Sequence, residues 1–248
     1  MKKLFLLIPV LILIECSSDR KDVIFHYSVL KALDNGVLEG NMKIGELKKH
    51  GDFGLGTFNK LNGEMIILDQ VVYRISPEGK IMQPDDQALV PYSVVTFFNQ
   101  EDSLFMSGGI TYQSLKEYVA RRIPSLNLFY AFRIRGDFGY IKCGGANEQE
   151  KPYDRSLSEM LADRPVYEGK NIEGTLVGFW CPVYIGDINT NGFHLHFISD
   201  DHKMGGHLME FTARSLKIGY DIKPVYKILL PDTKMFREAH FRSEAVNY

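Results

Sequence analysis

Residues 192–207, Gly192-Phe-His-Leu-His-Phe-Ile-Ser-Asp-Asp-His-Lys-Met-Gly-Gly-His207, hold four of the seven histidines of the chain. His194 and His196 stand two residues apart in an alternating run, so in a β-strand both side chains point to one face, about 6.6 Å apart along the chain. The turn-forming residues between 199 and 206 bring the next strand back antiparallel. We therefore expect His207 to face the same pocket as the first two imidazoles.

Three imidazoles with an open coordination position are typical of a catalytic rather than a structural zinc site. Nitrogen ligands suit Zn²⁺ and leave Fe, Cu, Ni and Co as other candidates. The pattern thus predicts His194, His196 and His207 as metal ligands, and a solvated His-x-His pair on a strand surface is the alternative. We expect His202, in its charged turn, to be solvated. The remaining histidines are expected to have structural or surface roles: His26, His50 and His240.

Composition excludes several classes of protein. Apolar residues make up 45% of the 248 residues and charged residues 24%, which is ordinary globular composition and excludes a disordered or fibrous chain. The net charge of -2 creates no strong field for nucleic acid, so no nucleic-acid partner is expected. None of the three cysteines forms a Cys-x-x-Cys pair, which excludes zinc-finger and redox motifs. Cys143 and Cys181 are expected to be free.

Strand-like runs of β-branched and aromatic residues dominate the chain. A few helices interrupt them: residues 28–33, a helix capped by Thr111 or Ser114 and stopped by Pro124, and residues 156–162. Gly136-Asp137 predicts a tight hairpin. The strand runs are 53–58, 63–68, 71–75, 93–98, 128–135, 138–143, 175–180, 192–199, 206–214 and 218–230.

We therefore expect an α/β chain of the α+β type, with mixed and antiparallel sheets. The polar segment 147–154 predicts a division into two β-rich halves, an N-terminal α/β half (23–150) and a C-terminal half (151–248) that carries the histidines.

Residues 1–22 have the character of an export segment. Lys2 and Lys3 precede the apolar run 4–14, which is shorter than the roughly 20 residues of a membrane-spanning helix. The run ends at Cys16 and a charged stretch, an arrangement that resembles a bacterial lipoprotein signal in which the cysteine is lipidated. Ordinary signal cleavage and an uncleaved anchor are the alternatives. We expect an exported protein, periplasmic or at the surface.

One carboxylate draws attention on local grounds. Glu64 opens an otherwise apolar strand after a turn. A carboxylate at the head of such a strand is most often a surface residue, whereas a catalytic metal needs a proton donor or acceptor close by. Spacing alone leaves both interpretations of Glu64 open.

Two further blocks extend this pattern, Gly51-Asp-Phe-Gly-Leu-Gly-Thr-Phe-Asn-Lys-Leu-Asn-Gly-Glu-Met-Ile66 and Gly174-Thr-Leu-Val-Gly-Phe-Trp180. With the run 192–207, in this order and spacing, they resemble the alpha-acetolactate decarboxylase family. The resemblance extends from about residue 26 to residue 231, which is most of the chain.

The resemblance implies a metal-dependent lyase that converts 2-acetolactate to acetoin and CO₂. It implies metal ligation by His194, His196 and His207, an acid/base role for Glu64, and substrate contact by the backbone of Thr57 and Leu61. It also implies a two-part, sheet-rich subunit that is usually dimeric, with the metal in the cleft between the parts. A divalent cation would stabilise the negative charge left by loss of CO₂, and protonation of one face would make the acetoin chiral.

Two departures from the family raise an alternative. The family has an arginine where this chain has Gly144, so a rigid fork of cationic donors is missing there. Lys142, of the same strand parity, is a candidate substitute. The family also carries another Glu in a longer C-terminal tail, for which Glu244 is the candidate here. The alternative is a metal-binding relative with altered or lost activity, acting on another 2-hydroxy-3-oxo acid or only binding.

Two other interpretations remain. Cupin-like barrels also place His-x-His and a later histidine on strands around a metal, but the expected Glu after the pair is replaced by Asp200 and Asp201. A non-catalytic surface lipoprotein would rest on the N-terminal segment alone.

Overall fold

The computed structural model describes residues 21–241. The apolar run 4–14, Cys16 and Glu244 lie outside these residues, so the expected export, lipidation and tail glutamate stay predictions. No helix in the described part of the chain is long and apolar enough to span a bilayer.

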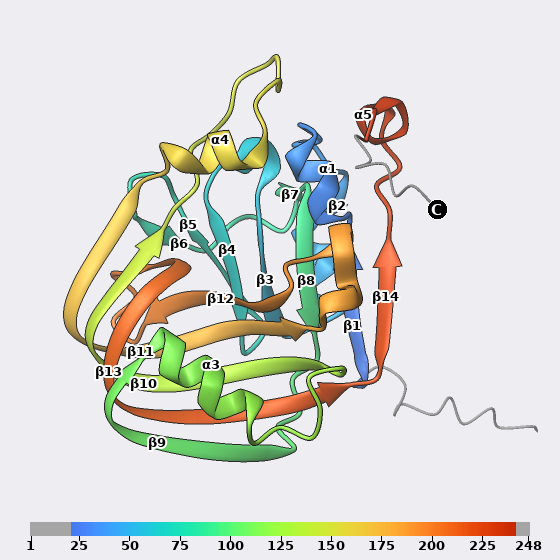
Figure 1. Cartoon of the computed structure of the whole chain (residues 1–248). Helices are drawn as coiled ribbons and strands as arrows, with labels where there is room; N and C mark the ends of the chain where they lie inside the picture. Colours follow the sequence, from blue (N-terminus) through green and yellow to red (C-terminus); the bar gives the residue numbers. More distant parts are fainter. Residues whose placement is uncertain (1–20, 242–248) are drawn as a thin grey trace, which may run out of the picture.

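A seven-stranded mixed sheet forms one layer of the molecule, with the strand order β14-β1-β8-β3-β4-β5-β6. Its neighbours are antiparallel except for β1 and β14, which run parallel. In Figure 1 its strands stand upright at the back and right of the molecule. They are β1 (Val23–Tyr27), β3 (Phe53–Thr57), β4 (Glu64–Leu68), β5 (Val71–Ile75), β6 (Ile81–Met82), β8 (Tyr92–Thr96) and β14 (Val225–Leu229).

A five-stranded antiparallel sheet forms the second layer, with the order β10-β11-β12-β13-β9. Because β10 pairs with both β11 and β13, the four strands from β10 to β13 close on one another. Long curved strands make this layer, and they run across the lower part of Figure 1. They are β9 (Asp102–Thr111), β10 (Phe129–Gly144), β11 (Val166–Cys181), β12 (Gly192–Ser199) and β13 (Gly205–Lys223).

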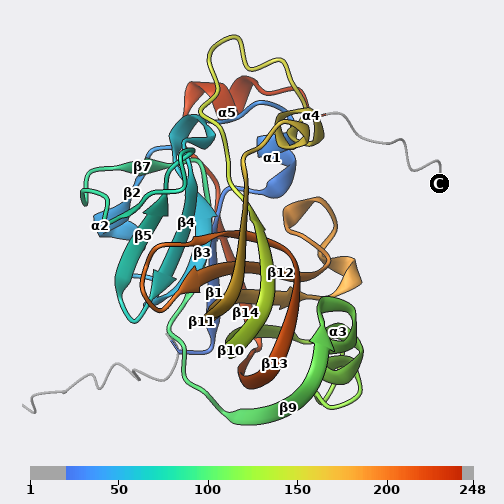
Figure 2. The ribbon, with the colours of Figure 1, turned by 90° about the vertical axis from the view of Figure 1, so that its left-hand side faces the viewer.

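Short helices and a small ribbon complete the fold. Helix α3 begins with a capping box between Thr111 and Ser114 and packs Leu115 and Val119 into the core of the five-stranded sheet. Helices α1 and α4 lie together at one end of the molecule in both views (Figures 1 and 2). The remaining elements are α1 (Leu30–Asp34), β2 (Met42–Lys43), α2 (Ile44–Leu47), η1 (Asn59–Leu61), β7 (Leu89–Val90), α3 (Tyr112–Ala120), α4 (Leu157–Ala162), η2 (Val183–Ile188) and α5 (Lys234–Glu238).

Strand parity decides which side chains lie between the two sheets. On β12, Phe193, Leu195 and Phe197 enter the core of the five-stranded sheet, whereas Ile198 enters the core shared with the seven-stranded sheet. The alternation therefore turns His194 and His196 toward the seven-stranded sheet.

The expected α+β architecture with mixed and antiparallel sheets and few helices is confirmed. The expected hairpin at Gly136-Asp137 is wrong, because β10 runs without interruption from Phe129 to Gly144. Gly136 pairs with both β11 and β13, and a Cβ on it would lie 2.5 Å from Leu216 Cδ2, so the glycine serves close packing rather than a turn. The strand runs 206–214 and 218–230 likewise form one long strand, β13, followed after Pro224 by β14.

The chain crosses between the two layers several times. β9 and β10 precede residue 150 yet belong to the five-stranded sheet, and β14 near the C-terminus joins the seven-stranded sheet. The sheets are thus not divided by sequence at residue 150, and the domain boundary expected there stays a prediction.

A buried ion pair ties the end of β13 to the rest of the fold. Lys223 Nζ lies 2.6 Å from Asp221 Oδ2 and donates to the carbonyl oxygens of Phe97 (3.0 Å) and Lys21. Replacing Asp221 by Asn would leave the buried ammonium without its counter-charge. We expect Asp221→Asn to lower the free energy of unfolding by about 3–5 kcal/mol, measured by denaturant titration.

The matched control is Asp137→Asn, which breaks an exposed pair with Arg214. Exposed pairs contribute about 0–1 kcal/mol. If both variants lost the same free energy of unfolding, burial would not make the Asp221–Lys223 pair more stabilising than an exposed pair.

Candidate functional site

Three imidazoles converge between the two sheets, as the spacing predicts. His196 on β12 stands directly opposite His207 on β13 in the strand register. His194 lies two residues before His196 on the same strand. The three ring centroids are 5.1–5.3 Å apart. One nitrogen from each ring lies within 4.8 Å of the others, so the group could hold a single metal ion.

The glycine pair before His207 allows this convergence. Gly206 has a φ of +140°, in the region that favours glycine. A Cβ on Gly206 would lie 2.6 Å from the carbonyl oxygen of Gly144, so only glycine lets β13 approach β10 here. The close approach places His207 beside the two imidazoles of β12.

The environment keeps the three imidazoles neutral, which is the form that binds a metal. Burial lowers the pKa of His194 well below its usual value, and the neighbouring histidines lower it further. Burial also lowers the pKa of His196 to about 3, and the neighbouring His207 contributes to this shift. The pKa of His207 is lowered to about 4 by burial and by the nearby charge of Arg164.

Hydrogen bonding fixes the tautomer of one ring. His196 Nδ1 lies 2.9 Å from the carbonyl oxygen of Met65, which only accepts, so Nδ1 carries the proton. Its Nε2 is then free of hydrogen and faces the cavity, as a ligating nitrogen must. The buried Nδ1 of His194 has no hydrogen-bond partner among the described residues. The donor set therefore fits a divalent transition metal.

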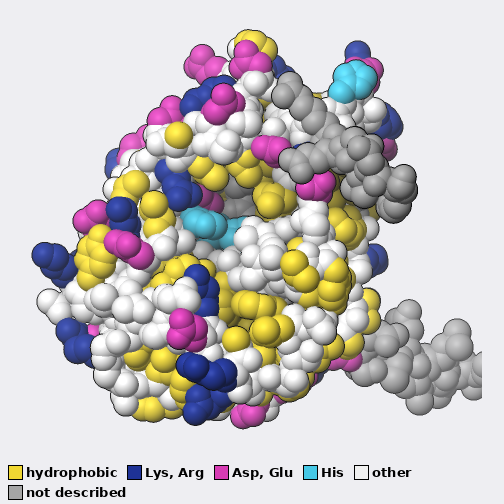
Figure 3. All heavy atoms as spheres, in the orientation of Figure 1, with side chains coloured by type: hydrophobic (Ala, Val, Ile, Leu, Met, Phe, Trp, Pro, Cys, Tyr) yellow, Lys and Arg dark blue, Asp and Glu magenta, His cyan; other side chains and the backbone are white. Residues whose placement is uncertain are grey.

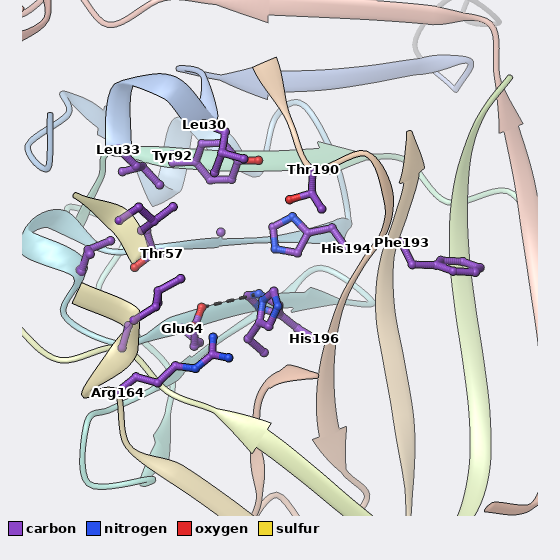
Figure 4. A pocket seen from close by; sticks show the side chains of 16 residues that line it. Leu30, Leu33, Thr57, Glu64, Tyr92, Arg164, Thr190, Phe193, His194 and His196 are labelled. Atoms are coloured by element: carbon purple, nitrogen blue, oxygen red, sulfur yellow. Dashed lines mark ion pairs between the residues drawn. The ribbon is translucent and has the colours of Figure 1, made fainter. Parts of the chain in front are cut away.

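Glu64 lies opposite the histidines at the head of β4. It shares strand parity with Ile66, which packs in the core between the sheets, and its Oε2 lies 3.6 Å from His196 Nε2 (Figure 4). The surface interpretation of Glu64 is wrong, since only 7% of the residue is exposed. Burial raises the pKa of this carboxyl to about 8, and the nearby Arg164 guanidinium opposes part of the rise. At neutral pH the group can therefore hold a proton.

Thr57 and Leu61 both line the same cavity. Thr57 Oγ1 donates a hydrogen bond to the carbonyl oxygen of Gly63 (2.8 Å), which closes the turn before Glu64. Leu61 has a φ of +54°, a conformation that bulky residues rarely adopt and that often marks functional segments. Their contact with substrate stays a prediction.

A cavity of about 260 Å³ joins these groups. Its polar floor is formed by the three histidines and Glu64, and its walls are apolar, with Leu30 and Leu33 from α1 and Leu157 and Leu161 from α4. In Figure 3 it appears as a hollow with histidine side chains exposed at its base. The histidine group thus lies in the cleft between the two layers.

The other histidines do not belong to this group of ligands. His202 is exposed in its turn beside the ring of Tyr73, His240 is exposed, and His50 stacks on Phe25. His26 is fully buried, with Nδ1 hydrogen-bonded to the Tyr226 hydroxyl (2.8 Å). These positions agree with the structural and surface roles expected.

Sequence reasoning missed several cavity residues. Tyr92, Thr190 and Arg164 line the cavity and come from three separate segments. No spacing pattern links them to the histidines, so the sequence carried no signal for them. Lys142, the candidate substitute for a cation at Gly144, instead faces Glu168 at 3.8 Å and is not among the cavity residues. Cys143 and Cys181 are buried and free, as expected.

Comparison with known proteins gives the family. Residues 24–243 match the family model described as alpha-acetolactate decarboxylase. The chain is 34% identical over 225 residues to the alpha-acetolactate decarboxylase of Methanosarcina mazei, covering 91% of this chain and 78% of that protein. It is 36% identical over 218 residues to that of Klebsiella aerogenes, covering 88% and 84%.

The fold agrees with this match. The crystal structure of alpha-acetolactate decarboxylase from Bacillus subtilis strain 168 superposes with a TM-score of 0.87 at 32% identity, covering 90% of this chain and 94% of that one. The family model, the similar sequences and the similar structure each extend over most of the chain. This chain therefore belongs to the alpha-acetolactate decarboxylase family.

Proposed function

We propose that this protein decarboxylates 2-acetolactate to acetoin and CO₂ with a divalent metal, Zn²⁺ in the first place, held by His194, His196 and His207. The observation that carries the proposal is the meeting of three neutral imidazoles and a buried carboxyl group in one cavity. Three nitrogen ligands leave coordination positions for substrate oxygens, as in catalytic zinc sites. When bound, the metal supplies Lewis-acid stabilisation of the negative charge that develops as CO₂ leaves.

The residues of the chain have separate tasks in this reaction. The leucines of α1 and α4 accommodate the methyl groups of the substrate and exclude water, which strengthens the electrostatic interactions inside. Loss of CO₂ leaves an electron pair that must take up a proton. The Glu64 carboxyl, which holds its proton at neutral pH, delivers it to one face, so that the acetoin is chiral. Thr57 and Leu61 position the substrate through their backbone.

Activity with acetolactate tests this proposal. We expect the metal-loaded protein to form acetoin from 2-acetolactate, a chelator to abolish the reaction, and added Zn²⁺ to restore it. Acetoin is measured directly, together with the metal content of the same sample. Metal-loaded protein that leaves acetolactate unchanged would exclude this function.

Gly144 motivates a second candidate, altered specificity or lost catalysis. The resemblance to the family predicts an arginine at this position, and glycine has no side chain that could supply a charge or a hydrogen-bond donor. Comparison of 2-acetolactate with its homologue that carries an ethyl group in place of the methyl separates the two. Preference for the larger acid supports altered specificity, and metal binding without turnover of either acid supports a binding role.

Export with lipid anchoring through Cys16, and a homodimeric assembly, complete the proposal. The N-terminal pattern supports the first, and the resemblance to the family supports the second. Mass spectrometry of the membrane-associated protein would detect a lipidated Cys16, and sedimentation analysis would give the oligomeric state.

A further inference from the structure

We propose that Arg164 binds the carboxylate of the substrate and so supplies the cation that the resemblance to the family predicts at position 144. This inference rests on the proposed function and adds to it a substrate-binding residue contributed by the segment between α4 and β11. Its guanidinium enters the cavity opposite His194, beside Glu64 and His196 (Figure 4).

The backbone holds Arg164 at the end of β10. Gly145 donates a hydrogen bond to the carbonyl oxygen of Pro165 (2.8 Å), and Gly144 pairs with Val166 on β11. On its other side Gly144 pairs with His207. The sheet therefore fixes the backbone next to Arg164 and places it close to His207, one of the three histidines.

The position of Arg164 depends on the glycine. A Cβ on Gly144 would lie 2.7 Å from Arg164 Nε and 2.9 Å from its Cδ and Cζ. Such distances are shorter than van der Waals contact, so a side chain at position 144 and the present position of Arg164 exclude each other. The glycine at 144 and the entry of Arg164 into the cavity are thus two sides of one arrangement.

Arg164 makes no ion pair within the part of the chain that is described. None of its atoms takes part in a hydrogen bond there, although the Glu64 carboxyl lies near it in the same cavity. Several other arginines each face a carboxylate: Arg133, Arg135, Arg155, Arg214 and Arg237. A partly buried cation without a partner is unfavourable, and a bound carboxylate would remove that cost.

A guanidinium suits this ligand, since its planar fork donates two parallel hydrogen bonds to a carboxylate. The hydroxyl and ketone oxygens of the same acid are then left for the side of the cavity where the three histidines lie. The carboxylate is present in the bound substrate and leaves as CO₂. Binding of the ground state raises affinity more than turnover, so loss of Arg164 should raise KM more than it lowers kcat.

Binding of an unreactive acid tests the inference independently of turnover. The probe is 2-hydroxyisobutyrate, which keeps the carboxylate and hydroxyl and lacks the ketone, and acetoin serves as the neutral comparison. Calorimetry on the metal-loaded full chain gives both affinities. We expect Arg164→Gln to weaken the acid about 10- to 100-fold and to leave acetoin unchanged.

Lys142→Gln is the matched control, because it removes a positive charge from the same end of β10 but outside the cavity. It should bind both probes like the unaltered protein. Arg164→Lys keeps the positive charge and loses the planar pair of donors, so it should retain part of the affinity for the acid. This variant also tests the inference if Arg164→Gln does not fold. The exchange Gly144→Arg with Arg164→Gly should restore binding of the acid.

Equal affinity of Arg164→Gln and Lys142→Gln for 2-hydroxyisobutyrate would overturn the inference, as would failure of the unaltered protein to bind it. The proposed function fails in a different way. Then the unaltered protein makes no acetoin, while its affinity for the acid still depends on Arg164.

Discussion

Replacing His207 by alanine is expected to abolish acetoin formation and to weaken metal binding by far more than 100-fold. Loss of a partner that only orients a metal ligand costs about 10- to 100-fold, and loss of a ligand itself removes a bond to the ion. His207 is the best of the three for this test. It is only half-buried, whereas His196 also satisfies the Met65 carbonyl, so that its removal would damage the fold as well.

His202→Ala is the matched control for His207→Ala. His202 lies five residues earlier in the exposed turn, where its ring packs beside that of Tyr73. Metal content after dialysis, acetoin formation and the circular dichroism spectrum are measured for both variants. A folded His207→Ala protein that retains metal with unchanged affinity would show that the three imidazoles do not form one site.

The histidine group was predictable because it depends on local rules. The two-residue period of a strand sets the common face of His194 and His196, and a glycine-containing turn returns the chain so that His207 stands opposite. Both rules act within sixteen residues. The contacts that complete the group therefore require no knowledge of the remaining fold.

The opposite wall of the cavity was not predictable in this way. Glu64 is buried because α1, α4 and the five-stranded sheet cover the head of β4, and these elements lie far from it in sequence. From its neighbours alone, Glu64 looked like a surface residue. In the structure Glu64 shares strand parity with Ile66, while Met65 and Ile67 pack on the other face. Because both parities of this strand are apolar in the sequence, the pattern alone did not show which face meets the cavity.

Long-range pairing also decided where the strands end. Glycine and aspartate at 136–137 are typical of a tight turn, but β10 has partners on both sides at this point, and these pairings hold it extended. β13 likewise continues through residues 214–218 because β9 and β10 pair with it there, with a register shift between Ala213 and Ser215. Sequence patterns describe a segment by itself, and in a closed sheet the neighbours override them.

Replacing Glu64 by glutamine is expected to slow acetoin formation about 100- to 10,000-fold, the usual contribution of a positioned proton donor. Glutamine has nearly the same shape and cannot give up a proton at neutral pH. The side chain is buried and its pKa is raised by desolvation, so the folded protein already holds the neutral form, and the substitution should cost little stability. Metal content should stay unchanged, because the predicted ligands are the three histidines.

The handedness of the product gives a second readout for Glu64. If its carboxyl delivers the proton to one face, the residual acetoin from Glu64→Gln should lose its excess of one enantiomer, which chiral chromatography measures. A merely structural defect would lower the rate and leave the enantiomer ratio as it was. Rate and handedness together therefore separate proton delivery from distortion of the cavity.

Glu148→Gln provides the matched control for Glu64→Gln. Glu148 is exposed and hydrogen-bonded to Asn62, in the turn that leads into β4, so the variant removes a carboxylate from the same neighbourhood without entering the cavity. It should keep full rate and handedness. A Glu64→Gln protein that stays within tenfold of the normal rate would exclude Glu64 as the proton donor. Loss of the metal together with the rate would instead make Glu64 a ligand, because a carboxylate 3.6 Å from His196 Nε2 is close enough to share its ion.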